Sequence, residues 1–180
     1  MATVFTHALV GGLLAGPMRV ELPRARLSAF LAVIAVLPDI DVVAFAAGIP
    51  YVHPLGHRGI THSLTFGLML APLATSLAFP RLRRFGSAWW RVTAAAALAC
   101  ISHGFLDAFT DGGKGVGFFI PFDAERIFFP WRPLIVSPLG VESFASRAGP
   151  VLWSELRWVW LPVLALAGAW QFSQRPRSRS

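Results

Sequence analysis

Apolar residues fall into five long runs separated by short polar segments. A helix that crosses a membrane needs about 20 consecutive apolar residues, and the first run is short for this unless it is tilted or only partly inserted. The pattern predicts an all-α polytopic membrane protein with about five transmembrane or membrane-embedded helices. The runs cover residues 3–18, 27–49, 63–79, 92–110 and 151–172.

Domain organisation follows from the same pattern. No internal repeat is visible, so residues 1–172 are predicted to form a single membrane-embedded helical domain. The Ser-, Arg- and Pro-rich residues 173–180 are predicted to form a basic disordered tail. The first residues lack a basic stretch and a cleavage site, and we interpret them as mature protein rather than a signal peptide.

Composition supports a membrane protein. The 180 residues are 55% hydrophobic and 14% charged, with a mean hydropathy of +0.59, which is too apolar for an ordinary soluble domain. The net charge of +7 comes almost wholly from arginine, since Lys114 is the one lysine. The arginines cluster between apolar runs, which fits membrane topology better than a nucleic-acid-binding face, so no nucleic-acid partner is expected. The single cysteine, Cys100, permits no disulfide within the chain.

The arginine clusters also predict an orientation. Ten of the fifteen arginines lie in residues 19–26, 81–91 and 175–179. With five spans these three segments fall on one side, which the positive-inside rule makes cytoplasmic. We therefore expect a multi-pass protein of the cytoplasmic (inner) membrane with its N-terminus outside and its C-terminus inside.

Acids and a proline interrupt the second apolar run. Pro38 removes a backbone donor and should kink or break the helix. Asp39 and Asp41 are two residues apart, so on a regular helix they would face different ways. Both can reach one site only where the backbone is locally unwound. Ionisable groups inside a membrane are costly and usually mark function.

Histidines and further acids lie in three other segments. His7 is in the first run, and His57 and His62 belong to the connector His57-Arg58-Gly59-Ile60-Thr61-His62-Ser63. In the fourth run His103, Asp107 and Asp111 follow at i, i+4 and i+8, on roughly one helix face. In the predicted orientation all of these groups converge near the non-cytoplasmic face, which predicts a shared site there.

Histidine and aspartate without cysteine suit a divalent metal. Zn²⁺ is the first expectation, with Mn²⁺ or Fe²⁺ as alternatives. The candidates outnumber the ligands of one tetrahedral site, which favours either two ions or one ion with orienting groups and a base. The predicted metal ligands are His7, Asp39, His57, His62, His103 and Asp107.

Further residues receive catalytic or substrate-binding predictions. Asp41 or Asp111 is expected to act as general base, although Asp111 would also suit a helix cap. Basic residues are expected to hold an anionic head group, or else to contact lipid phosphates passively: Arg58, Lys114, Arg126 and Arg132. The glycine-rich residues 112–117 match no nucleotide-binding loop, and Ser63 lacks a nucleophile-elbow setting.

Three motifs together resemble the YdjM-like family of inner-membrane metal-dependent hydrolases. They are Leu-Pro-Asp-Ile-Asp, His-Arg-Gly-Ile-Thr-His-Ser and His-Gly-Phe-Leu-Asp-Ala-Phe-Thr-Asp-Gly-Gly, and the later Gly-Val-Gly-Phe-Phe-Ile-Pro-Phe segment is similar too. The resemblance implies a bacterial polytopic membrane protein that holds a divalent metal. The family name also carries a link to the SOS repressor LexA, which no feature of this sequence explains.

These observations predict a membrane-embedded hydrolase in which metal-activated water attacks an amphiphilic substrate at the non-cytoplasmic face. A phospholipid or another lipid-linked phosphoester is the expected substrate, and membrane lipids are the expected surroundings. One alternative is a metal or proton transporter, but the cytoplasmic halves of the spans carry almost no polar residues. The other is a non-catalytic protein with a structural metal.

Overall fold

Five continuous helical runs form most of residues 1–174, the part of the chain that the computed structural model describes. These residues contain no β-strand, and two isolated bridges join Thr110 to Leu134 and Val116 to Ile127. The prediction of an all-α protein is confirmed. The predicted disordered tail lies almost entirely outside the described residues. The elements are α1 (Val4–Leu13), α2 (Arg24–Val36), the 3-10 helix η1 (Leu37–Val42), α3 (Val43–Ala46), the 3-10 helix η2 (Ile60–His62), α4 (Leu64–Ala78), α5 (Ser87–Ala108), α6 (Val141–Glu155), the π-helix η3 (Leu156–Trp160) and α7 (Leu161–Ser173).

Two of the helical runs are long and apolar enough to cross a membrane. They are Arg24–Ala46, which joins α2, η1 and α3, and Val141–Ser173, which joins α6, η3 and α7. Helices α1 and α4 are apolar but shorter than a full span. Five crossings of the bilayer therefore remain a prediction.

Helix boundaries differ from the apolar runs at several places, and the ends of two helices illustrate this. Helix α1 ends at Leu13, while the first run continues to residue 18, because Gly16-Pro17 forms a turn. Helix α6 begins at Val141, well before the apolar run at 151. Gly140 precedes it with φ +95°, a backbone conformation that favours glycine and redirects the chain into the helix.

Small side chains allow α1, α2, α4 and α5 to pack closely. A Cβ added to Gly11 in α1 would lie 2.5 Å from the Cβ of Ala35 in α2, so only glycine permits this approach. Buried alanines of α2 and α5 belong to one core cluster, and such small residues favour close helix packing. The main core consists of buried residues that include Leu27, Leu31, Ala35, Val92, Ala96, Ala99 and Cys100.

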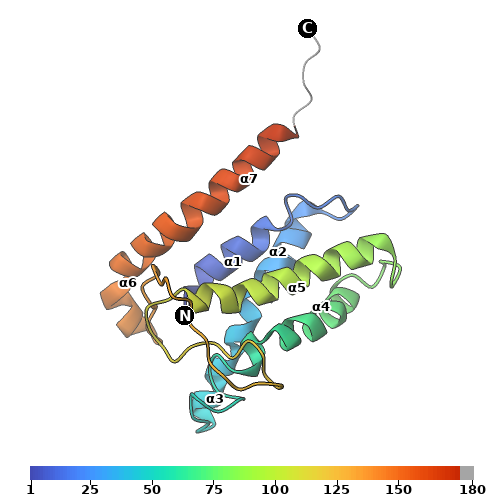
Figure 1. Cartoon of the computed structure of the whole chain (residues 1–180). Helices are drawn as coiled ribbons and strands as arrows, with labels where there is room; N and C mark the ends of the chain where they lie inside the picture. Colours follow the sequence, from blue (N-terminus) through green and yellow to red (C-terminus); the bar gives the residue numbers. More distant parts are fainter. Residues whose placement is uncertain (175–180) are drawn as a thin grey trace.

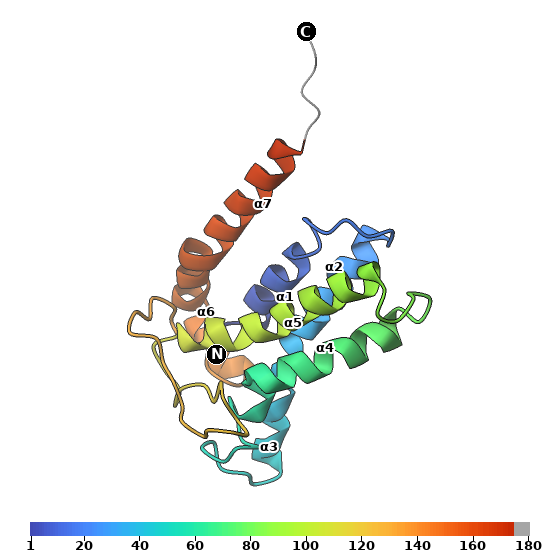
Figure 2. The same ribbon diagram turned by 45° about the vertical axis from the view of Figure 1, so that its right-hand side comes forward.

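The bundle has two chemically different ends. Connections 14–23 and 79–86, which carry clustered arginines, lie toward one end, as Figure 1 shows. Helix α3, the start of α1 and the end of α5 lie toward the other, together with the loops between α5 and α6 (Figure 2). This separation agrees with the predicted placement of arginines and of site residues at opposite ends.

A buried carboxylate attaches the last helical run to the start of the chain. Glu155 accepts hydrogen bonds from the backbone N–H and the hydroxyl of Thr3, and from the hydroxyl of Thr6. One turn later Trp160 Nε1 donates to Thr6 Oγ1 at 2.6 Å. From this attachment α7 diverges from α1 toward the arginine-rich end (Figures 1 and 2).

Candidate metal centre

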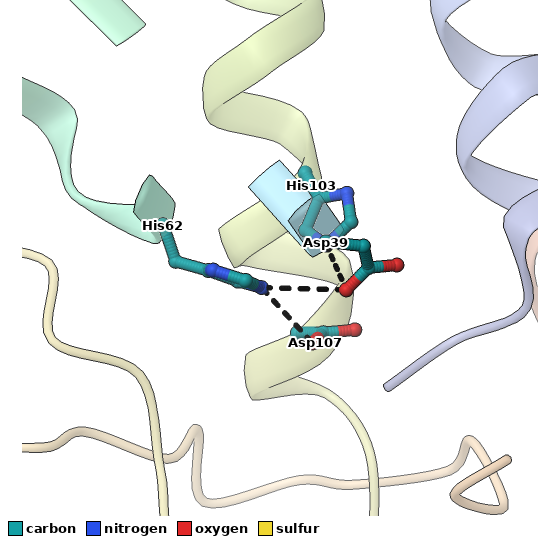
Figure 3. Close-up of side chains that lie close together, drawn as sticks. All are labelled: Asp39, His62, His103 and Asp107. Atoms are coloured by element: carbon teal, nitrogen blue, oxygen red, sulfur yellow. Dashed lines mark ion pairs between the residues drawn. The ribbon is translucent and has the colours of Figure 1, made fainter. Parts of the chain in front are cut away.

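Four ionisable side chains from three chain segments meet inside the bundle. Asp39, His62, His103 and Asp107 each offer one ligand atom, and these atoms all lie within 4.8 Å of one another. Asp39 Oδ1 is 3.3 Å from His103 Nε2 and 3.8 Å from His62 Nε2. Asp107 Oδ2 is 3.7 Å from His62 Nε2. Figure 3 shows the two imidazoles and two carboxylates converging on one point.

The 3-10 helix η1 directs the two aspartates of the second run to different partners. Pro38 stands at its start, where the α-helix cannot continue regularly. Asp39 turns toward His103, and Asp41 turns toward His57 and His62. The expectation that both acids reach one region only through a local departure from the α-helix is confirmed.

Helix α5 supplies His103 and Asp107 one turn apart, both fully buried. His103 Nδ1 lies 2.7 Å from the carbonyl oxygen of Ala35, so this nitrogen carries the proton and donates it. Its Nε2 is then a free lone pair facing the centre. Gly104 allows the helix to approach His62, because a Cβ there would lie 2.8 Å from the His62 carbonyl oxygen.

Asp41 orients His62 in the same manner. His62 Nδ1 is 3.1 Å from Asp41 Oδ2, and Thr61 Oγ1 donates to that same oxygen at 2.7 Å. Burial alone would lower the pKa of His62, but the Asp107 and Asp41 carboxylates outweigh it and raise the pKa to about 9. His62 thus presents Nε2 to the centre while Asp41 holds Nδ1.

The donor atoms fit a divalent cation. His62 Nε2, His103 Nε2 and both carboxylate oxygens of Asp39 are buried and have no hydrogen-bond partner among residues 1–174. Leaving such groups unpaired in a protein interior costs about 1–3 kcal/mol each. Two imidazole nitrogens and two carboxylate oxygens form a ligand set that a zinc ion accepts. The predicted presence of buried His and Asp groups that could hold a metal is confirmed, and which metal stays a prediction.

Arg58 occupies a position that the sequence did not predict. We expected it to hold a substrate head group, yet its side chain is fully buried and its Nε is 3.0 Å from Asp107 Oδ2. Its Nη1 donates to the Gly112 carbonyl oxygen and its Nη2 donates to Thr110 Oγ1. With every side of the guanidinium engaged by the protein, Arg58 is a positioning residue for Asp107.

His57 and His7 border the four-residue group without belonging to it. His57 Nδ1 is 2.6 Å from Asp41 Oδ1, and with His62 these residues form a second group whose spacing could also hold a metal. The ring of His7 stacks on His103 with centroids 3.6 Å apart, and its Nε2 is 3.5 Å from Asp107 Oδ1. Both predicted ligands therefore lie next to the centre.

The remaining predicted site residues lie outside the four-residue group. Asp111 accepts a hydrogen bond from the backbone N–H of Val136 and is exposed. Lys114 lies over the Tyr51 ring, 5.8 Å from its centroid. Arg126 donates to backbone carbonyls of the 51–57 loop, and Arg132 lies over the Phe128 ring. Base catalysis by Asp111 and head-group binding by the other three stay predictions.

Sequence reasoning missed the contacts that the start of the chain makes. The Ala2 backbone N–H donates to Asp107 Oδ1 at 2.7 Å, so residues before α1 help to hold a candidate ligand. Glu155, which binds Thr3, is fully buried. The position of Glu155 inside an apolar run could have predicted this contact, because an acid in such a run needs a buried partner.

Replacing Asp41 with asparagine should lower the divalent-metal affinity of the protein by about 10–100-fold, the usual cost of losing a group that orients a histidine ligand. The asparagine keeps the size of the side chain but removes the charge that holds His62 Nδ1–H. Isothermal titration of zinc into the metal-stripped variant measures this. An affinity equal to that of the wild type would show that Asp41 does not orient His62.

Comparison with known proteins agrees with the motif resemblance. The model of the YdjM inner membrane protein family matches residues 1–177. The chain is 37% identical over 169 residues to "Inner membrane protein YbcI" of Escherichia coli (strain K12), an alignment that covers 93% of this chain and 96% of that protein. No solved structure matches.

Proposed function

The chain belongs to the YdjM inner membrane protein family, and from that premise we propose that it is a membrane-embedded, metal-dependent hydrolase. One observation carries the proposal: imidazole and carboxylate groups lie buried together with their ligand atoms lacking hydrogen-bond partners. When bound there, a divalent cation would supply a reactive water and electrostatic stabilisation of developing negative charge. We propose a lipid-linked phosphoester at the non-cytoplasmic face as the substrate class.

Each residue of the centre has a proposed role. Asp39, His62, His103 and Asp107 hold the cation, with His7 as a neighbouring candidate. Asp41 and Arg58 position His62 and Asp107 respectively.

Asp39 is the best-placed proton acceptor. The side chain of Asp39 is 10% exposed, although both of its carboxylate oxygens are covered, and the side chains of His62, His103 and Asp107 are fully covered. In Figure 3 one of its oxygens faces both imidazoles and the other points away. That second oxygen can take a proton from an attacking water. Asp41 is less suited to this task because His57, Thr61 and the Arg58 backbone already occupy its oxygens.

The depth of the centre supports a second candidate function, a structural metal in a non-catalytic membrane protein. Three of the four side chains are fully buried, and the oxygens of the fourth, Asp39, are covered as well. A structural site has a closed ligand shell, whereas a catalytic site keeps one position for water. Turnover therefore separates the two functions.

The decisive experiment combines metal analysis with a hydrolysis assay. The purified protein should contain about one zinc, manganese or iron ion per chain, and it should release phosphate or a head group from at least one lipid phosphoester in a panel. A chelator should abolish turnover and the added metal should restore it, while His103→Ala should remain inactive under both conditions. If the protein held a stoichiometric metal ion but hydrolysed no substrate of the panel, the result would favour a structural role of the metal.

Metal binding is expected to release a proton and to depend on pH. His62 has a pKa of about 9 in the metal-free protein, so its imidazole carries a proton at pH 7.5 that must leave when a cation binds. Apparent affinity should therefore rise by up to about tenfold per pH unit between pH 6.5 and 8.5. Calorimetry in buffers of different ionisation enthalpy counts the protons. No proton release, with affinity independent of pH, would contradict the role of His62 as a ligand.

A further inference from the structure

A cleft of about 750 Å³ opens between α7 and the adjoining parts of α1 and α2. Its volume lies within the roughly 300–1,000 Å³ typical of small-molecule sites. None of the residues of the metal centre lines it. Its lining includes Gly16 and Pro17 of the connection 14–23, which lies at the arginine-rich end of the bundle in Figure 1. The apolar part of its wall includes Val10, Leu13, Leu14, Val163, Leu166 and Trp170.

The cleft exists because α7 is held near both of its ends and not between them. Near its start Trp160 donates to Thr6, and beyond its end Arg19 Nη2 donates to Gln174 Oε1 at 3.2 Å. Between these contacts no residue of α7 is fully buried, and only Val163 and Ala167 are half-buried. Since an apolar surface in a bilayer is covered by hydrocarbon when no protein covers it, an acyl chain is the natural filling of this cleft.

One wall of the cleft carries a cation with unused donors. Arg24 lines the cleft and donates through Nη1 to the carbonyl oxygens of Ala15 and Gly16. Its Nε and Nη2 groups donate to no atom of residues 1–174. Guanidinium groups bind phosphate through paired N–H donors, so Arg24 is suited to a phosphate beside an apolar channel.

The charge around the cleft favours an anionic ligand. Among residues 1–38 Glu21 is the one acid, against Arg19, Arg24 and Arg26. Helix α7 carries no acid at all. Arg91, from the start of α5, donates to the Arg19 carbonyl oxygen and brings a further positive charge to the same connection.

We infer that this cleft binds one anionic phospholipid, with an acyl chain along α1 and α7 and the phosphate at Arg24. By the positive-inside rule the lipid belongs to the cytoplasmic leaflet. This inference goes beyond the proposed function, because the cleft shares no lining residue with the metal centre and requires no catalysis.

Native mass spectrometry of the full-length protein, released from nanodiscs of equimolar phosphatidylglycerol and phosphatidylcholine, tests the inference. The wild type should retain one phosphatidylglycerol in preference to phosphatidylcholine. Arg24→Gln should lower phosphatidylglycerol retention roughly fivefold, the effect expected for one arginine at a membrane surface. Ala167→Phe, which places a ring in the cleft, should lower retention of both lipids.

Matched controls separate the cleft from the rest of the surface. Arg84→Gln removes an exposed arginine of the 79–86 connection, and Ala169→Phe adds the same ring on α7 outside the cleft. Both controls, and His103→Ala at the metal centre, should retain lipid like the wild type. Equal retention of the two lipids by the wild type, or equal losses in Arg24→Gln and Arg84→Gln, would overturn the inference. A wild-type dimer that Ala167→Phe dissociates would overturn it too, since a second copy would then fill the cleft.

Discussion

Replacing His103 with alanine is expected to weaken divalent-metal binding by more than about 100-fold, because loss of a ligand exceeds the 10–100-fold cost of losing an orienting partner. His103 is fully buried, and the Ala35 carbonyl oxygen fixes which of its nitrogens faces the centre. In the variant Asp39 also loses its neighbour His103 Nε2, which lies 3.3 Å from Asp39 Oδ1 in the wild type.

Competition against a chromophoric chelator measures this loss. His53→Ala is the matched control, since His53 is exposed and its Nδ1 accepts from the neighbouring Leu55 backbone N–H. The control should bind metal as tightly as the wild type. If His103→Ala bound a stoichiometric ion with unchanged affinity, the four-residue group would not be the metal site.

Replacing Arg58 with methionine is expected to lower the free energy of unfolding by about 3–5 kcal/mol, the usual cost of leaving one partner of a buried ion pair alone. Both Arg58 and Asp107 are fully buried, and Arg58 also donates to the 110–112 turn. Methionine fills most of the arginine volume, so the loss would reflect charge and hydrogen bonding rather than a cavity. Thermal or denaturant unfolding in a mild detergent measures the change.

Two further variants test the cause of that loss. Arg132→Met removes an arginine that lies over the Phe128 ring near the surface, and it should change stability little. The double variant Arg58→Met with Asp107→Leu should recover part of the lost stability, because it removes the unpaired charge as well. A double variant less stable than Arg58→Met alone would contradict an electrostatic origin.

Periodicity and chain order predicted the parts of the site that depend on local structure. His103 and Asp107 are one helical turn apart, and a helix at 92–110 was expected, so their shared face followed from spacing alone. Pro38 next to two acids predicted a broken helix, and the 3-10 segment Leu37–Val42 is that break. The periodicity of the helix and the ring of proline determine the shared helix face and the helix break, so both could be predicted from the sequence.

Long-range contacts decided what the sequence did not predict. Arg58 was expected to bind a substrate head group and Glu155 received no prediction, but their partners are Asp107 and Thr3, far away along the chain. Likewise His57 pairs with Asp41 and lies outside the four-residue group, although the motif does not distinguish it from His62. Which histidine reaches a centre depends on the loop path, and here Gly59 sets that path, since a Cβ at this residue would lie 2.1 Å from the Pro54 carbonyl oxygen.

The four ligand atoms belong to segments that are distant along the chain, namely η1, η2 and the second half of α5. An ion held by all of them would act as a cross-link between three parts of the bundle. Anything that binds the folded state alone raises its stability, by about 4 kcal/mol at a free concentration 1,000 times the dissociation constant. Supply of the ion would then govern how long the whole protein survives in the membrane, in addition to any chemistry at the centre.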